Sequence, residues 1–212
     1  MHAVIFDMDG VISDTQALAA QVESELLKKH HVDHPGQWYT ERYAGTPHAV
    51  MFHELLPGLS QEDILFLVEK TWTSLLEQVP NVLPVPGIHH LLETLARKGY
   101  LLAVASTSKR EYVDKVLSTL DVMPFFHAIV TGDEVAKGKP SPDIFLLAAK
   151  RLGVPPEHCT VIEDGAAGMK GAKAAGMRCI GLVATPDATS KEQVPADCTV
   201  SRLEEIEQRH LL

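Results

Sequence analysis

The stretch VIFDMDGVISDT, residues 4–15, joins a short apolar run directly to a pair of aspartates. Residues 4–6 are β-branched or aromatic, which is typical of a buried strand, and we expect that strand to end at Asp7. Side chains two residues apart in an extended chain point the same way, so Asp7 and Asp9 start out converging on one volume before Gly10 allows a turn. The stretch therefore predicts two carboxylates at the end of a buried strand.

Two carboxylates in one volume need compensation. Because like charges repel, one carboxyl group keeps its proton unless a cation offsets the charge. Mg²⁺ is a common solution, since it binds one or two carboxylates together with the phosphate oxygens of a substrate. Taken alone, the stretch fits a solvated Asp-Gly turn equally well. A calcium-binding loop fails on spacing, because Val11 and Ile12 stand where that loop needs a third Asx residue and its glycine.

The composition is that of an ordinary globular protein. The chain has 212 residues, 45% of them hydrophobic and 22% charged, which is enough to bury a sizeable core. Its formal net charge of −9 argues against nucleic acid or an anionic membrane as the main partner. Three cysteines cannot all pair, which favours reduced thiols and a cytoplasmic location. We find no signal-peptide pattern and no apolar stretch of membrane-spanning length, and we expect a monomer.

Residues 16–80 are predicted to form a block of helices inserted after the first strand. Apolar residues recur at helical spacing over residues 16–31, and Pro35-Gly36 closes this helix. Further helices are expected over residues 47–56 and 60–79, the last opening with a weak capping box. No segment of the block has the pattern of a strand.

Beyond the block, strands and helices alternate. The expected strands cover residues 101–105, 128–130, 160–162 and 178–183. The expected helices cover residues 88–98, 109–120, 142–151, 166–175 and a final one near 202–209. This order predicts an α/β fold with a mostly parallel, Rossmann-like sheet covered on both faces. In such sheets ligands bind at the carboxyl ends of the strands, which is where the chemistry is expected.

Polar residues follow the first three of these strands. Ser106, Thr107 and Ser108 precede a helix, so they could bind an anion or act only as an N-cap cluster. Lys139 stands just before a proline and a new helix, whereas Lys137 fits a solvated loop.

The strand over residues 160–162 ends in a second acidic pair, Glu163-Asp164. Alone this is another turn, but the four strand ends together would form one rim of carboxylates, hydroxyls and a lysine. Phosphoryl transfer requires acids for Mg²⁺, a lysine and N–H groups for phosphate, and a free carboxylate as nucleophile.

At this point the chain closely resembles the haloacid-dehalogenase superfamily of phosphatases and phosphomutases, in its β-phosphoglucomutase and phosphoglycolate-phosphatase-like branch. The motifs occur in the family's order from residue 4 to about 176, and four in order make a specific match. The matching residues are Asp7, Asp9, Gly10, Asp14 and Thr15, then Ser106, then Lys139 in KPSPDIF, then Glu163, Asp164, Gly165 and Gly168.

The resemblance implies a role for each acid. Asp7 would be the nucleophile that becomes an aspartyl phosphate, and Asp9 the general acid for the leaving alkoxide and then the base for water. Mg²⁺ would be bound by the Asp7 carboxylate, the Asp9 backbone carbonyl and Asp164. Glu163 would contribute directly or through water.

The resemblance also implies a division of labour between two domains. Ser106 and Lys139 would hold the transferring phosphoryl oxygens. Residues 1–15 and 81–212 would form the core domain, and residues 16–80 a helical cap that closes over the site, excludes water and selects the substrate.

The choice between activities depends on Asp9 and on the cap. Asp9 argues against dehalogenase and phosphonatase activity, because those relatives lack an acid at this position. A β-phosphoglucomutase would need a cap histidine and a cap arginine where this chain has Ala19 and His48. We therefore favour hydrolysis of a small phosphate monoester, with the phosphomutase as the alternative and a non-catalytic binding protein as a third hypothesis that predicts loss of a motif residue.

The substrate, a small phosphorylated metabolite, is expected between the cap and the core. The candidate substrate contacts are Gly45, Thr46, His48, Ser106, Thr107, Ser108, Lys109, Arg110 and Lys139. His48 is as well explained as a polar residue at a helix start. Trp38, Tyr39 and Tyr43 could line the cap pocket, but packing among the cap helices is favoured. The histidines at positions 30, 31, 34, 89 and 90 show no metal-binding spacing.

Overall fold

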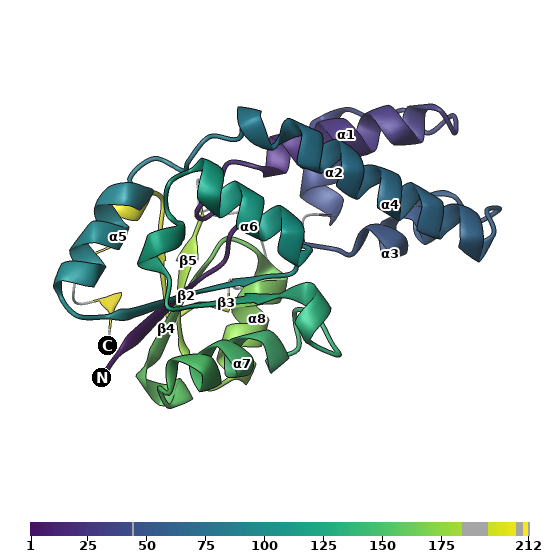
Figure 1. Ribbon diagram of the computed structural model, residues 1–212. Coiled ribbons are helices and arrows are strands. Elements are labelled where there is room, and N and C mark those ends of the chain that lie inside the picture. The colour runs from purple at the N-terminus through teal and green to yellow at the C-terminus, as the bar shows by residue number, and fades with distance from the viewer. Residues whose placement is uncertain (44, 184–194, 207–209, 212) are drawn as a thin grey trace.

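The computed structural model describes residues 1–43, 45–183, 195–206 and 210–211, and in them six strands form one sheet (Figure 1). The strands are β1 (Ala3–Phe6), β2 (Leu101–Ser106), β3 (Ala128–Thr131), β4 (Cys159–Glu163), β5 (Arg178–Leu182) and β6 (Cys198–Val200). Their order is β3-β2-β1-β4-β5-β6, and every neighbouring pair is parallel. The predicted α/β fold is confirmed, with β1 at the centre of the sheet.

Alternate residues of β1 face opposite sides of the sheet, and helices cover both of these apolar faces. Val4 and Phe6 belong to an apolar cluster with α5 (Ile88–Arg97) and α6 (Arg110–Thr119). Ile5 belongs to a second cluster on the other face. The helices of that face are α7 (Asp143–Leu152) and α8 (Ala166–Ala174), as Figure 1 shows. A strand buried on both faces reads as a continuous apolar run, as residues 3–6 do.

A separate block of helices follows β1 and lies at the end of the molecule away from the N-terminus (Figure 1). Its helices are α1 (Gln16–Lys28), α2 (Gly36–Tyr43), α3 (His48–Leu55) and α4 (Gln61–Gln78). They enclose an apolar cluster of their own, in which Tyr39 and Phe52 are fully buried. The predicted capping box of α4 is present, with the Ser60 side chain accepting from the Asp63 N–H.

Three elements differ from the sequence prediction. Helix α2 was not expected, because it starts at the Pro35-Gly36 pair and buries only Tyr39 and Tyr43, which leaves little helical periodicity. Strand β6 was missed because it is a three-residue edge strand. The final helix predicted near residues 202–209 was wrong over its first turn, where only a 3₁₀ turn, Leu203–Glu205, occurs. Residues 207–209 lie outside the described part of the chain.

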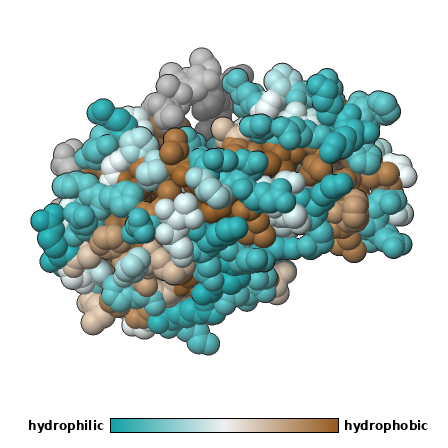
Figure 2. Space-filling view, turned by 45° about the horizontal axis from the view of Figure 1, so that its top comes forward, coloured by the Kyte–Doolittle hydropathy of each residue, from teal (hydrophilic) through white to brown (hydrophobic). Residues whose placement is uncertain are grey.

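The face of the molecule seen in Figure 2 is mostly hydrophilic. In the space-filling view hydrophilic side chains cover much of the core, whereas hydrophobic residues gather in a band over the helical block (Figure 2). Among the residues described here, we find no helix with both the length and the apolar character that crossing a membrane requires.

Candidate active site

The site lies where the central strands end, beside the helical block. The register aligns Phe6 of β1 with Val104 of β2 and with Ile162 of β4. The Asp7 N–H donates to the carbonyl of Ile162 over 3.0 Å, which extends the ladder by one residue. The chain segments that follow β1, β2 and β4 therefore meet at one edge of the sheet, as the strand-end rule requires.

Lys139, from the loop after β3, joins two of the predicted acids. Its Nζ lies 2.5 Å from Oδ1 of Asp7 and 2.7 Å from Oε1 of Glu163. The three side chains are only 6%, 10% and 3% exposed, respectively. Burial lowers the pKa of Lys139, but the charges of Asp7 and Glu163 more than offset it, so the pKa lies above its usual value. The lysine is therefore a fixed positive charge inside the site.

Asp7, Glu163 and Asp164 form what we call the acid trio, in which one oxygen of each lies within 4.8 Å of the others. Burial, reinforced by the neighbouring acids, raises the pKa of Asp7 well above its usual value although Lys139 opposes the shift. Burial and then the charge of Glu163 raise the pKa of Asp164 to about 7. One lysine does not balance three carboxylates, and the donors are all oxygens. The trio thus fits a hard divalent cation such as Mg²⁺.

Without a divalent cation, we expect the protein to lose stability as the pH rises from 5 to 8. A carboxyl group whose folded-state pKa is raised stabilises the fold below its unfolded pKa, and this contribution is lost as the pH rises through the folded value. For Asp164 that window runs from about 4 to about 7. Thermal unfolding in EDTA should give a Tm several degrees lower at pH 8, and added Mg²⁺ should reverse the fall. A flat profile in EDTA would contradict this charge balance.

Asp9 makes a different set of contacts from Asp7. Its Oδ1 accepts from the Thr15 hydroxyl over 2.5 Å, and its Oδ2 accepts from Ser108 over 3.0 Å. The Ser106 hydroxyl approaches the same Oδ2 at 3.4 Å. Asp9 therefore stands outside the acid trio, where hydroxyl groups hold its carboxyl group in place.

Gly10 and Gly168 have no side chain, and the side chains of Asp164 and Glu163 occupy the space beside them. A Cβ at Gly10 would lie 2.0 Å from Oδ2 of Asp164, and a Cβ at Gly168 would lie 1.6 Å from Oε1 of Glu163. Gly10 also has a φ of +85°, which favours glycine. A side chain at either glycine position would therefore collide with an acidic side chain of the site.

Gly168→Ala tests this fit against helix propensity. Alanine is favoured in a helix by about 1 kcal/mol, but the new methyl group meets Glu163, which Lys139 and the Gly165 N–H both hold at 2.7 Å. We expect the steric cost to prevail, lowering the free energy of unfolding by about 1–3 kcal/mol and reducing cation affinity. Urea unfolding and Mg²⁺ titration measure both effects. Gly58→Ala, with open space around it, should change neither.

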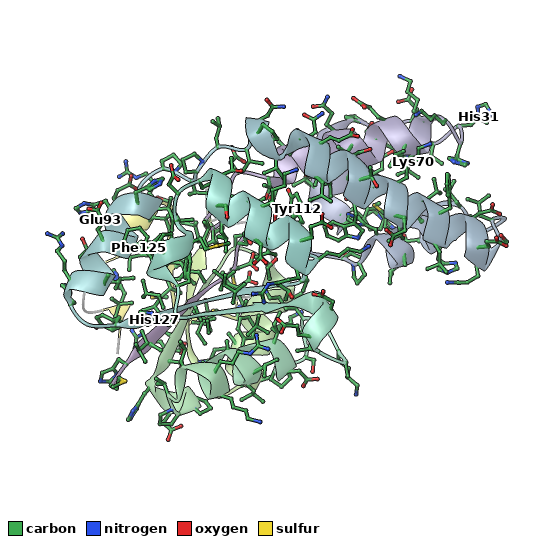
Figure 3. The ribbon with its side chains drawn as sticks, in the orientation of Figure 1. His31, Lys70, Glu93, Tyr112, Phe125 and His127 are labelled. Carbon is green, nitrogen blue, oxygen red and sulfur yellow. The ribbon has the colours of Figure 1, made fainter. Side chains whose placement is uncertain are left out.

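A cavity of about 490 Å³ lies between the helical block and the core. The predicted core residues that line it are Asp7, Asp9, Thr107, Ser108, Lys109, Lys139, Glu163 and Asp164. The predicted residues of the block that line it are Gly45, Thr46 and His48. Tyr112 of α6, labelled in Figure 3, also lines the cavity at the junction of the two parts. Most of the candidate residues are thus brought together around one space.

The structure places two predicted substrate contacts elsewhere. Ser106 is fully buried at the end of β2, where its hydroxyl also accepts from the Ser108 N–H, and it does not line the cavity. Arg110 begins α6 but extends away from the cavity, donating to Asp114 and to the Ile129 carbonyl. A residue at a strand end or a helix start is exposed to the site only if its side chain points toward it, and the sequence pattern does not specify this direction.

The comparison with known proteins decides the family. Residues 4–182 match the model of the haloacid dehalogenase-like hydrolases. The chain belongs to this family. It is 37% identical over 191 residues to a phosphorylated carbohydrates phosphatase of Thermotoga maritima, an alignment that covers 86% of each chain. The family resemblance and the enzyme class expected from the motifs are both confirmed.

Two further relatives of this hydrolase are a phosphomutase and a protein solved with bound phosphate. A β-phosphoglucomutase of Bacillus subtilis is 33% identical over 196 residues, covering 86% of this chain and 83% of the relative. The crystal structure of CbbY from Rhodobacter sphaeroides in complex with phosphate is 28% identical, with a TM-score of 0.83 and coverage of 97% and 96%. A phosphatase and a phosphomutase thus stand among its relatives.

Sequence reasoning missed several residues of the hydrolase that line the cavity. The Gln16 amide donates to Oδ2 of Asp164, and Glu23 lines the cavity from the same helix. The spacing of seven residues is two helical turns, so it places both on one face of α1 and could have been read from the sequence. Trp72 and Tyr112 gave no such signal, because their helical positions are equally typical of core packing.

Proposed function

We propose that this hydrolase is a Mg²⁺-dependent phosphatase that releases inorganic phosphate from a small phosphorylated carbohydrate or similar monoester. The observation that carries the proposal is the division between the two aspartates. Asp7 lies in the acid trio against Lys139, whereas Asp9 is held apart by hydroxyl groups. One carboxylate is thus set up as a nucleophile and the other as a proton carrier, at the edge of a single cavity.

In the first step an Asp7 oxygen would attack phosphorus and form an aspartyl phosphate. The bond from phosphorus to the substrate oxygen breaks, and the leaving alkoxide takes a proton from Asp9. In the second step Asp9 takes a proton from water as that water attacks phosphorus. The bond to Asp7 breaks, which restores its carboxylate and releases phosphate.

Other residues would support these steps. Lys139 offsets negative charge at Asp7 and at the transferring oxygens. Ser106, although buried, would position Asp9 and Ser108, because its hydroxyl donates to Oδ2 of Asp9 and accepts from the Ser108 N–H. The acid trio, with the backbone carbonyl of Asp9, would hold Mg²⁺, which when bound supplies positive charge to the phosphoryl oxygens.

We further propose that residues 16–80 are a cap domain and that residues 1–15 and 81–212 are the core domain. The cavity lies between these two parts, and helices α4 and α6 meet beside it. Lys109 of the core pairs with Glu69 of the block over 2.6 Å, and Trp72 of the block packs against Tyr112. A cap in this place would exclude water from the aspartyl phosphate until the leaving group has gone.

A phosphomutase is the second candidate, because the β-phosphoglucomutase of Bacillus subtilis is 33% identical to this chain. A mutase must also grip a second phosphate. The cap positions that the resemblance assigns to this task hold Ala19 and His48. His48 lies 3.2 Å from Oε1 of Glu23, a carboxyl group that would repel a second phosphate. We therefore favour the phosphatase.

A phosphate-release assay over a panel of phosphorylated metabolites tests the proposal. With p-nitrophenyl phosphate and sugar phosphates we expect release that depends on Mg²⁺ and stops in EDTA. The mutase is tested with β-glucose 1-phosphate and a trace of the 1,6-bisphosphate. Efficient formation of glucose 6-phosphate without phosphate release would overturn the preference for hydrolysis.

A further inference from the structure

Among the described residues that line the block side of the cavity, only Glu23 of α1 carries a carboxyl group. Its side chain is only 11% exposed, and the structure pairs it with Nε2 of His48, which is 12% exposed and begins α3. Both residues line the cavity. A carboxyl group nearly removed from water needs hydrogen-bond partners, and it has room to accept others from whatever fills the space.

A row of aromatic rings lines the cavity from this pair toward the reacting groups. The His48 ring centroid lies 5.0 Å from that of Trp72, and Trp72 lies 5.7 Å from Tyr112. Tyr112 is near enough to Asp9 for that charge to contribute to its raised pKa, after the larger effect of burial. The row therefore runs from the proton carrier of the core to Glu23, and it offers an apolar surface to the carbon skeleton of a substrate.

The cations of the cavity are engaged elsewhere. Lys139 is paired with two residues of the acid trio, and Lys109 is paired with Glu69 at 2.6 Å in a solvent-exposed position. Within the described lining of the cavity, no other lysine or arginine is present. A second phosphate or a carboxylate at the block end would therefore face the carboxyl group of Glu23, with no lysine or arginine committed to it.

We infer that Glu23, whose Oε1 lies 3.2 Å from Nε2 of His48, selects substrates by the part of the molecule that remains after the phosphate, which we call the tail. Its carboxylate accepts hydrogen bonds from hydroxyl groups of a neutral sugar or polyol and repels a tail that carries a second anion. This inference rests on the proposed phosphatase function and adds the substrate class: phosphate monoesters with an uncharged, hydroxylated remainder. Bisphosphates and phosphorylated acids are disfavoured by the same residue.

Two matched pairs of substrates test the inference on the unaltered enzyme. Fructose 6-phosphate is compared with fructose 1,6-bisphosphate, and glycerol 1-phosphate with 3-phosphoglycerate. In each pair one member has a neutral tail and the other a second anionic group. We expect kcat/KM to favour the neutral member roughly ten- to hundredfold, the scale of a hydrogen bond to a charged group.

Glu23→Gln keeps the size of the side chain and removes its charge. We expect it to lower the neutral-to-anionic ratio of kcat/KM about tenfold or more in both pairs. Glu25→Gln, on the exposed face of the same helix, is the matched control and should leave the ratio unchanged. Because both substrates are measured on one preparation, the ratio does not depend on the fraction of folded enzyme.

Each result has a distinct meaning. No phosphate release from any compound, p-nitrophenyl phosphate included, would overturn the proposed function itself. Turnover of p-nitrophenyl phosphate with no preference for the neutral member of either pair would overturn only the role of Glu23. The same holds if Glu23→Gln leaves the ratio intact. If that variant does not fold, the preference of the unaltered enzyme still decides.

Discussion

Asp7→Asn is expected to lower kcat for phosphate release by about 10⁴-fold or more, while the protein still folds. An amide is a poor nucleophile, so no aspartyl phosphate forms and the two-step route is lost. The fold should survive because the substitution relieves crowding. Asp7 stands among acids that, with burial, raise its pKa well above its usual value. Lys139 keeps its contact with Glu163 at 2.7 Å.

The measurement combines activity with chemical trapping. The unaltered enzyme, quenched in acid during turnover, should carry an acyl phosphate that Asp7→Asn lacks. Asp121→Asn is the matched control, since Asp121 is exposed at the end of α6 with a φ of 56°, a conformation that asparagine also adopts. It should keep full activity. If Asp7→Asn retained substantial turnover in a clean preparation, Asp7 would be ruled out as the nucleophile.

The sequence was most informative about the sheet. Strands buried on both faces appear as apolar runs bounded by polar residues, so β1 to β5 could be located and their parallel order inferred from the helices between them. The sequence pattern did not predict the three-residue edge strand β6 or helix α2, because neither has an apolar run long enough to show a periodicity. Short elements depend on tertiary contacts, which a local pattern does not contain.

The site was predictable to the extent that backbone position decides it. Asp7 follows β1, Glu163 ends β4 and Lys139 lies in the loop after β3, so the topology directs all three toward one edge of the sheet. Side-chain direction is a further variable, which is why Arg110 was expected in the cavity and lies outside it. Glu23 lines the cavity but was not predicted to do so, because an acid on an amphipathic helix is usually solvated.

Lys139→Met is expected to lower the free energy of unfolding by about 3–5 kcal/mol at pH 8 and to abolish turnover. Methionine has nearly the same length and can still contact the Phe145 ring, over which the lysine Nζ now lies at 5.3 Å. The loss would therefore come from charge. Asp7 and Glu163 would remain buried without their common cation, and breaking a buried pair from one side carries a cost of this size.

The pH dependence separates this explanation from a simple packing defect. The pKa of Asp7 is already raised in the folded protein, and removing Lys139, which opposes the shift, raises it further. Stability from a raised carboxyl pKa is present below the unfolded pKa and is lost as the pH increases through the folded value. In urea unfolding with EDTA, Lys139→Met should thus be close to the unaltered protein at pH 5 and far below it at pH 8. Lys137→Met, exposed in the same loop, should match the unaltered protein at both. An equal loss at both pH values would mean that Lys139 acts by packing and that the acid trio does not need its charge.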